Sequence, residues 1–257
     1  MTDEEDQTPR RRGVYWLPNL LTTAALFSGF YAVVAAIDWN FEKAGIAIFV
    51  AMIFDGLDGR VARWTHTEST FGKEYDSLSD MVSFGLAPAI VTYQWGVARI
   101  AEYGDVWRRL GWLVCFFYAA AAALRLARFN SRSAVQDKSY FEGLPSPSAA
   151  AIVGAFVWLA SRTDTIGLPG LLLAFLITAC AGSLMVSRFP FNSLKKVDAG
   201  ARVKFAYIIL VPVAFALIAQ DPPVALLAVF GLYALSGPAL WAYRKAKRRG
   251  RGPAAPV

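Results

Sequence analysis

The stretch that decides the fold of this chain is FDGLDGRVARWTHTESTFGKEYDSLSD, residues 54–80. Strongly apolar segments lie on both sides of it, yet it holds the four aspartates Asp55, Asp58, Asp76 and Asp80. Charged side chains within a lipid bilayer are costly, and where they occur they usually mark a functional site. The four carboxylates therefore need partners that neutralise their charge, and these partners indicate the function of the stretch.

The composition of the chain predicts an all-α integral membrane protein. Hydrophobic residues make up 56% of its 257 residues and charged residues only 18%, whereas soluble domains carry about 45–50% apolar and about 25% charged residues. A membrane span needs about 20 mostly apolar residues. Eight such segments lie near residues 15–37, 44–64, 80–100, 110–129, 147–161, 167–187, 204–220 and 223–243. The acidic stretch interrupts the second and third segments and the fifth is short, so a bundle of six helices is the alternative.

The distribution of positive charge favours eight spans with both termini in the cytoplasm. Of the 26 Lys and Arg residues, 21 fall in segments that such a topology places inside, and five fall elsewhere. This asymmetry agrees with the tendency of cytoplasmic loops to carry Lys and Arg. We interpret the net charge of +7 in the same way, as contact with membrane lipids and not with nucleic acid. The predicted organisation is a polar tail at 1–13, a transmembrane domain at 14–243 and a basic tail at 244–257.

The spacing of the aspartates predicts a metal site. Asp55 and Asp58 are three residues apart and Asp76 and Asp80 are four apart, so each pair shares one face of a helix. Because consecutive spans are antiparallel neighbours, we expect the two pairs to converge at the cytoplasmic side. Oxygen ligands suit Mg²⁺ or Mn²⁺, and two such ions are a known arrangement for phosphoryl transfer. Gly59 leaves room beside the first pair, and Arg63 offers a phosphate partner.

Two other interpretations of the acidic residues remain open. A structural salt bridge, such as one between Asp58 and Arg60, would explain a single charged pair more easily than two helical pairs. An ion-coupled transporter also carries acids between its helices, but near the middle of the bilayer. The grouping of these acids at one membrane face favours a site open to a soluble nucleotide.

Written with its spacing, the stretch is Asp55-x2-Asp58-Gly59-x2-Ala62-Arg63-x8-Gly72-x3-Asp76-x3-Asp80. It resembles the signature of the CDP-alcohol phosphatidyltransferases at all eight fixed positions. The resemblance implies a membrane enzyme that transfers a phosphatidyl group from CDP-diacylglycerol to an alcohol and releases CMP. It also implies that the four aspartates hold two divalent ions, Mg²⁺ or Mn²⁺, and that Asp80 is the general base.

The resemblance also implies a binding site for CDP-diacylglycerol. Its residues would be Asn19, Thr22, Gly59, Arg63, Ser69 and Gly72. Asn19 and Thr22 belong to a shorter upstream element, Pro18-Asn19-x2-Thr22, which is less specific than the aspartate motif.

Three further segments indicate the acceptor. Residues 71–89, 123–130 (ALRLARFN) and 141–151 (FEGLPSPSAAA) resemble those of the membrane-type phosphatidylserine synthases, which favours L-serine. Arg125 and Arg128, at i and i+3, could hold the serine carboxylate or a donor phosphate, although they could equally serve as snorkelling residues. Glycerol 3-phosphate and inositol phosphate remain alternative acceptors. The family further implies a homodimer, which we expect to be a multi-pass protein of the cell membrane with its active site facing the cytoplasm.

Overall fold

A computed structural model describes residues 16–97, 103–132, 140–163, 167–192, 216 and 218–249, and these residues are mainly helical. The helices are α1 (Trp16–Ile37), α2 (Phe41–Trp64), α3 (Thr70–Asp80), the π-helical turn η2 (Met81–Leu86), α4 (Ala87–Trp95), α5 (Asp105–Arg132), α6 (Ser146–Arg162), α7 (Leu168–Val186) and α9 (Pro222–Arg249). Two short strands, β1 (Tyr140–Glu142) and β2 (Pro190–Asn192), complete the set of described elements.

The structure agrees with an integral membrane protein built from helices. Within the described residues, four segments are long and apolar enough to cross a membrane, namely Trp16–Ile37, Asp105–Ser131, Leu168–Val186 and Pro222–Lys247. Helices also cover the predicted second and fifth spans, and the third as far as Trp95, but these helices are too short or too charged to qualify by composition. Three predicted parts of the chain lie wholly or largely outside the described residues. They are the tail at 1–13, most of the span 204–220, and the basic tail beyond residue 249.

The third helical unit begins earlier than its apolar sequence predicts. Hydropathy places this span at 80–100, whereas α3 begins at Thr70 and continues through η2 into α4. The Ser69 hydroxyl caps α3 by accepting a hydrogen bond from the Gly72 N–H at 3.0 Å. A serine cap stabilises the first turn of a helix even where the residues of that turn are polar. Asp76 and Asp80 consequently lie on one continuous helix, as their spacing predicts.

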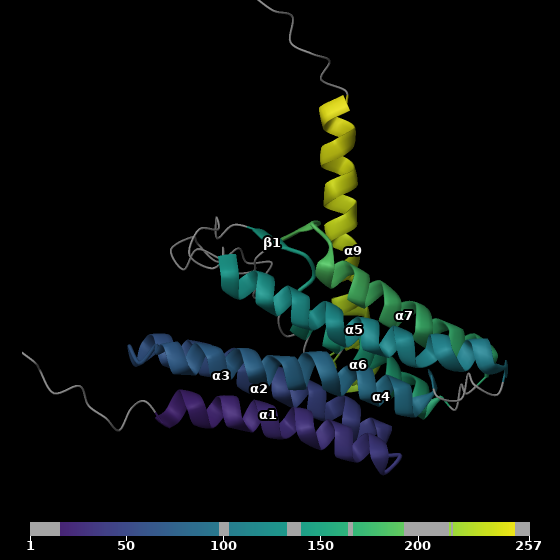
Figure 1. Cartoon of the computed structure of the whole chain (residues 1–257), viewed down its shortest axis with the longest axis horizontal. Helices are drawn as coiled ribbons and strands as arrows, with labels where there is room; N and C mark the ends of the chain where they lie inside the picture. Colours follow the sequence, from purple (N-terminus) through teal and green to yellow (C-terminus); the bar gives the residue numbers. More distant parts are fainter. Residues whose placement is uncertain are drawn as a thin grey trace, which may run out of the picture.

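Small residues allow the helices around the site to pack closely. Ala32, Ala36 and Ala44 are fully buried between α1 and α2, and Figure 1 shows these two helices side by side. Gly45 of α2 lies against Trp158 of α6, where a Cβ atom would be only 2.8 Å from that side chain. α9 crosses the direction of α5 and α7 in Figure 1, and its C-terminal part projects beyond them.

A two-stranded ribbon, which no pattern in the sequence indicates, joins the segments before α6 and after α7. β1 and β2 pair antiparallel, with Phe141 opposite Phe191. The Phe191 side chain is fully buried and packs on Tyr233 of α9 with ring centroids 5.6 Å apart. Strands of three residues are too short to show a reliable alternation of apolar and polar positions, so only the tertiary packing identifies them.

Candidate active site

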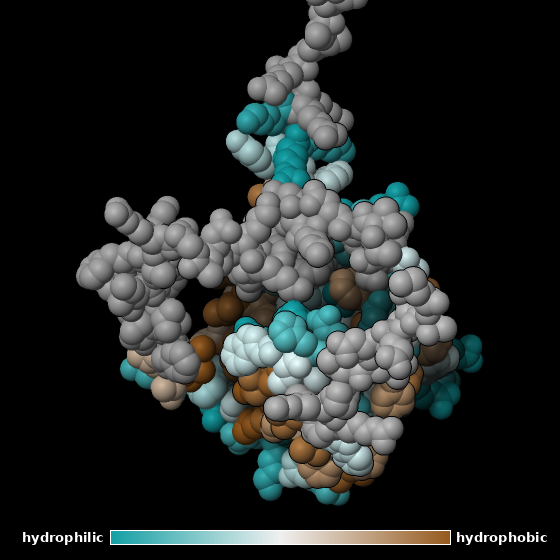
Figure 2. Space-filling model, turned by 90° about the vertical axis from the view of Figure 1, so that its left-hand side faces the viewer, coloured by the Kyte–Doolittle hydropathy of each residue, from teal (hydrophilic) through white to brown (hydrophobic). Residues whose placement is uncertain are grey.

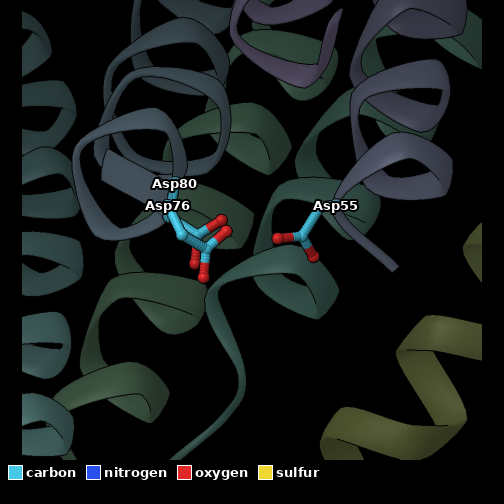
Figure 3. Close-up of side chains that lie close together, drawn as sticks. All are labelled: Asp55, Asp76 and Asp80. Carbon is cyan, nitrogen blue, oxygen red and sulfur yellow. The ribbon is translucent and has the colours of Figure 1, made fainter. Parts of the chain in front are cut away.

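Three of the four predicted metal ligands lie together in the structure. Asp55 of α2 faces Asp76 and Asp80 of α3, and their carboxylates point toward one another (Figure 3). One carboxylate oxygen from each residue lies within 4.8 Å of the other two. At an effective dielectric constant of about 20, two unit charges at such a separation repel by about 3 kcal/mol. The arrangement therefore requires neutralisation by cations or protons.

The contacts of the cluster fit a divalent cation. The carboxyl groups of Asp55 and Asp80 lie within hydrogen-bonding distance of each other, although two ionised carboxylates have no proton to donate. One oxygen of Asp76, Oδ1, is buried and has no hydrogen-bond partner. Oxygen ligands with unused lone pairs are what Mg²⁺ and Mn²⁺ bind.

The electrostatic surroundings of Asp76 also favour the binding of a cation. Asp76 precedes the predicted span 80–100. Burial, followed by the negative charges of Asp58 and Asp55, raises the pKa of Asp76 to about 7. A carboxylate whose ionised form is this costly gains a strong partner when a cation binds beside it.

The fourth predicted ligand, Asp58, is held differently. It is buried, and its Oδ2 accepts a hydrogen bond of 2.6 Å from the Thr22 hydroxyl of α1. The group of three close carboxylates does not include it. Asp58 instead lines an adjoining cavity together with Asp76, so the two acids connect the cluster to that cavity.

The cavity has a volume of about 610 Å³ and lies where α1, α2 and α3 meet. This volume falls within the usual range for sites that bind small molecules. All six residues predicted to bind CDP-diacylglycerol line it: Asn19, Thr22, Gly59, Arg63, Ser69 and Gly72. The cavity walls also include Lys73 and Glu74. The aspartate motif signals neither of these two residues, since they occupy variable positions within it.

Hydrogen bonds between helices fix the walls of the site. The Ser79 hydroxyl donates to the Thr22 carbonyl at 3.2 Å, and the hydroxyls of Thr23 and Tyr75 lie 2.9 Å apart. From α5, the Asn130 amide donates to the Ser77 hydroxyl at 2.8 Å. These bonds hold α3 against α1 on one side and against α5 on the other. Figure 2 views the end of the molecule where α3 begins and shows hydrophilic residues gathered among hydrophobic ones.

The two arginines proposed for the acceptor lie on α5 and bind protein groups. Arg125 donates to the hydroxyl of the buried Ser146 at 2.7 Å, and its Nε is buried without a hydrogen-bond partner. Its positive charge lies close enough to act on Asp80. Arg128 donates to the Val186 carbonyl at 3.0 Å. Of the two arginines, Arg125 therefore has a buried N–H group without a hydrogen-bond partner, and its charge lies near Asp80.

Comparisons with known proteins agree with this geometry. A sequence model of the family described as CDP-alcohol phosphatidyltransferase matches residues 15–186. The chain is 35% identical to CDP-diacylglycerol–serine O-phosphatidyltransferase of Helicobacter pylori strain J99, over 91% of this chain and 94% of that protein. It is 34% identical to the protein of the same name from Mycobacterium tuberculosis strain H37Rv, over 73% of this chain and 65% of that one. An archaetidylserine synthase of Methanothermobacter thermautotrophicus is 38% identical over 54% of this chain and 57% of its own length.

Proposed function

Because this chain belongs to the CDP-alcohol phosphatidyltransferase family, we propose that it transfers the phosphatidyl group of CDP-diacylglycerol to the hydroxyl of L-serine, giving phosphatidylserine and CMP. The names of relatives that match most of the chain support this reaction and its substrates. The observation that carries the proposal is the meeting of three carboxylates from α2 and α3 beside a cavity of nucleotide-binding size.

Asp55, Asp76 and Asp80 hold the divalent metal, with Asp58 as the fourth ligand. The proposed cofactor is a pair of Mg²⁺ or Mn²⁺ ions. When bound, such ions neutralise charge on the pyrophosphate and on the departing CMP. The unpartnered Asp76 Oδ1 and the contact between Asp55 and Asp80 support this assignment.

The cavity binds the CDP portion of the donor. Arg63 supplies a guanidinium for phosphate oxygens, and Lys73, which also lines the cavity, adds a second positive charge. Gly59 leaves the surface of α2 open, because its nearest side-chain neighbour would lie 3.7 Å from an added Cβ. Asn19, Ser69 and Gly72 contribute polar groups from α1 and the start of α3. The acyl chains extend into the surrounding membrane.

Asp80 acts as general base and Arg125 helps to place the acceptor. Asp80 takes the proton of the serine hydroxyl, and the oxygen that results forms a bond to the phosphorus that carries diacylglycerol. The bond from that phosphorus to the bridging oxygen breaks, and CMP leaves with this oxygen. Arg125, with Arg128 further along α5, pairs with the serine carboxylate, which fits the unpartnered Nε beside Asp80. The protein contributes mainly positioning and electrostatic stabilisation.

CMP release from CDP-diacylglycerol by the purified chain in detergent tests this function. We expect release with Mn²⁺ or Mg²⁺ and L-serine, and much less with glycerol 3-phosphate, with inositol phosphate or without any acceptor. Faster release with one of the other acceptors would replace serine while keeping the family chemistry. No release with any acceptor would contradict the proposed activity.

In the membrane, we propose a homodimeric multi-pass protein of the cell membrane with eight spans, both termini in the cytoplasm and the active site at the cytoplasmic face. The excess of Lys and Arg in the segments that this topology places inside supports the proposed orientation of the spans. A site at this face gives water-soluble serine and CMP direct access, while the donor stays in the lipid. The division into a tail at 1–13, a catalytic transmembrane domain at 14–243 and a basic tail at 244–257 follows from the same topology.

A further inference from the structure

The helix that carries Asp76 and Asp80 changes its winding directly after Asp80. Residues Met81–Leu86 form the π-helical turn η2, in which the Ala87 N–H bonds to the Val82 carbonyl five residues earlier. Within α-helices, π turns are rare and are frequent at functional sites. Its position between the carboxylates and the buried helix α4 calls for a physical explanation.

The π turn changes the direction in which the carboxylates face. Asp80 lies eleven residues before the fully buried Val91, and eleven residues of regular α-helix, at 100° each, would place both on one face, about 20° apart. A π turn contains one additional residue, which rotates the preceding part of the helix by about 100° relative to α4. Asp80 is thereby turned away from the face that Val91 buries in the core.

A missing backbone donor accompanies this turn. In an α-helix, the carbonyl of Phe84 would accept the N–H of residue 88, but residue 88 is proline and has none. The Tyr118 hydroxyl of α5 donates to that carbonyl at 3.1 Å. Both Tyr118 and Phe84 are fully buried, so no water takes over this bond if the hydroxyl is lost.

Close packing fixes Tyr118 and the π turn against each other. A Cβ atom on Gly85 would lie 3.1 Å from the Cβ of Ala122, one helical turn after Tyr118 on α5. A Cβ atom on Gly182 of α7 would lie 3.3 Å from the Tyr118 Cα. On the opposite side, the Ser83 hydroxyl donates to the Ala25 carbonyl of α1 at 3.1 Å. The π turn is therefore held between α1 and α5.

We propose that Tyr118 is a positioning residue for the reaction: its bond to Phe84 stabilises the π turn that aims Asp76 and Asp80 at Asp55. This role rests on the proposed function, since it concerns the same metal site. Tyr118 lies in α5, outside the aspartate motif, and its hydroxyl bonds to the backbone of η2. It also lies near enough to Arg125 of the same helix to interact with its charge.

Titration calorimetry of Mn²⁺ into the metal-free, full-length protein without substrate tests the proposal. Tyr118→Phe keeps the ring and removes only the hydroxyl, and we expect Mn²⁺ to bind about tenfold more weakly, as is typical when a group that orients metal ligands is lost. In turnover, kcat should fall while the KM for CDP-diacylglycerol stays within about twofold of wild type, because the cavity residues are unchanged.

Thr178→Val is the matched control. It removes another fully buried hydroxyl that bonds to a backbone carbonyl, that of Ala174 at 2.7 Å, but in α7, which carries none of the proposed site residues. Thr178→Val should bind Mn²⁺ as the wild type does. Wild-type Mn²⁺ binding in Tyr118→Phe, or equal weakening in both variants, would overturn the proposal.

Two provisions keep the result unambiguous. If Tyr118→Phe does not fold, Gly85→Ala takes its place, because its methyl group presses α5 away from the π turn and should weaken Mn²⁺ binding in the same direction. Wild-type binding in that variant would then overturn the proposal. Failure of the proposed function would be seen separately, as a wild-type protein that makes no phosphatidylserine although it binds Mn²⁺.

Discussion

At the scale of single residues, the four aspartates have different surroundings and therefore different roles. Thr22 already occupies one oxygen of Asp58 with a hydrogen bond of 2.6 Å, whereas Asp76 keeps a buried oxygen without a partner. Asp80 lies beside both Asp55 and Arg125. A base needs a position next to the incoming hydroxyl, and among the four aspartates Asp80 is the one that faces a positively charged group suited to the serine carboxylate.

Replacing the proposed base should separate chemistry from binding. Asp80→Asn keeps the size of the side chain but cannot accept the serine proton, so we expect kcat to fall by about 10²- to 10⁴-fold. Binding of CDP-diacylglycerol, measured by calorimetry, should change little. Turnover close to that of the wild type would remove Asp80 from the role of base.

Metal binding should weaken in mildly acidic solution. The pKa of Asp76 in the metal-free protein is about 7, and Mn²⁺ binds only the ionised carboxylate. Above pH 7 the ligand is ionised, and below it a proton competes, so the dissociation constant for Mn²⁺ should rise roughly tenfold between pH 8 and pH 6. Equal affinity at both pH values, measured by calorimetry, would contradict this coupling.

The sequence predicted the residues of the site better than their contacts. Helical spacing, which places i, i+3 and i+4 on one face, and the antiparallel order of consecutive spans predicted that four carboxylates converge. Three of the four lie together in the structure. The bond between Thr22 and Asp58 joins residues 36 positions apart, and no local pattern reports such a contact. The same holds for the unpartnered Nε of Arg125, which depends on how α5 packs.

At the scale of elements, α1 packs closely on η2, the turn that directly follows the acids of α3. A side chain on Gly29 would collide with Ser83 of the π turn, since an added Cβ would lie 2.6 Å from the Ser83 Cα. Gly56 of α2, between two of the aspartates, has no neighbouring atom within 4 Å of its Cβ position. The two glycines therefore have opposite tolerance for substitution.

We expect Gly29→Ala to destabilise the protein and Gly56→Ala to be tolerated. Overpacking a helix contact costs about 1–3 kcal/mol, while alanine favours a helix over glycine by about 1 kcal/mol. Thermal unfolding in detergent, followed by tryptophan fluorescence, checks both variants. A Gly29→Ala protein as stable as Gly56→Ala would show that α1 and η2 are not closely packed.

Hydropathy located most helices but not their irregular parts. The predicted segments 15–37, 44–64 and 167–187 agree closely with α1, α2 and α7, because long apolar runs report burial in lipid or core. The polar first turns of α3 were missed since a serine cap, and not apolar character, begins that helix. No periodicity in the sequence indicated the π turn, and the bond that Tyr118 donates to its Phe84 carbonyl joins residues 34 positions apart.

At the scale of the whole molecule, charged groups gather near both ends of α2. The aspartates lie toward the end where α1 begins, as the hydrogen bond from Thr22 to Asp58 shows. An ion-pair group of Glu42, Arg162 and Asp221 joins α2, α6 and the residue before α9, near the opposite end of α2. The crossing of α9 (Figure 1) was not predictable, because hydropathy gives the length of a helix and not its angle.

The proposed topology can be tested by labelling cysteines from one side of the membrane. After replacement of Cys115 and Cys180, the variant Asp38→Cys should react with an impermeant maleimide in intact cells, whereas Lys245→Cys should react only after permeabilisation. Asp38 follows α1 at the end away from the carboxylates, and Lys245 lies in the basic end of α9. Labelling of both residues in intact cells would contradict a cytoplasmic C-terminus.

The central claim is that the carboxylate cluster performs metal-dependent transfer of a phosphatidyl group to serine. The most direct test is mass-spectrometric detection of phosphatidylserine made by purified protein from CDP-diacylglycerol and isotopically labelled serine. The wild type and the control Asp38→Asn should make labelled phosphatidylserine with Mn²⁺ and none after EDTA treatment, and Asp55→Ala should make almost none. Labelled phosphatidylserine from the metal-free wild type, or from Asp55→Ala at the wild-type rate, would contradict the claim.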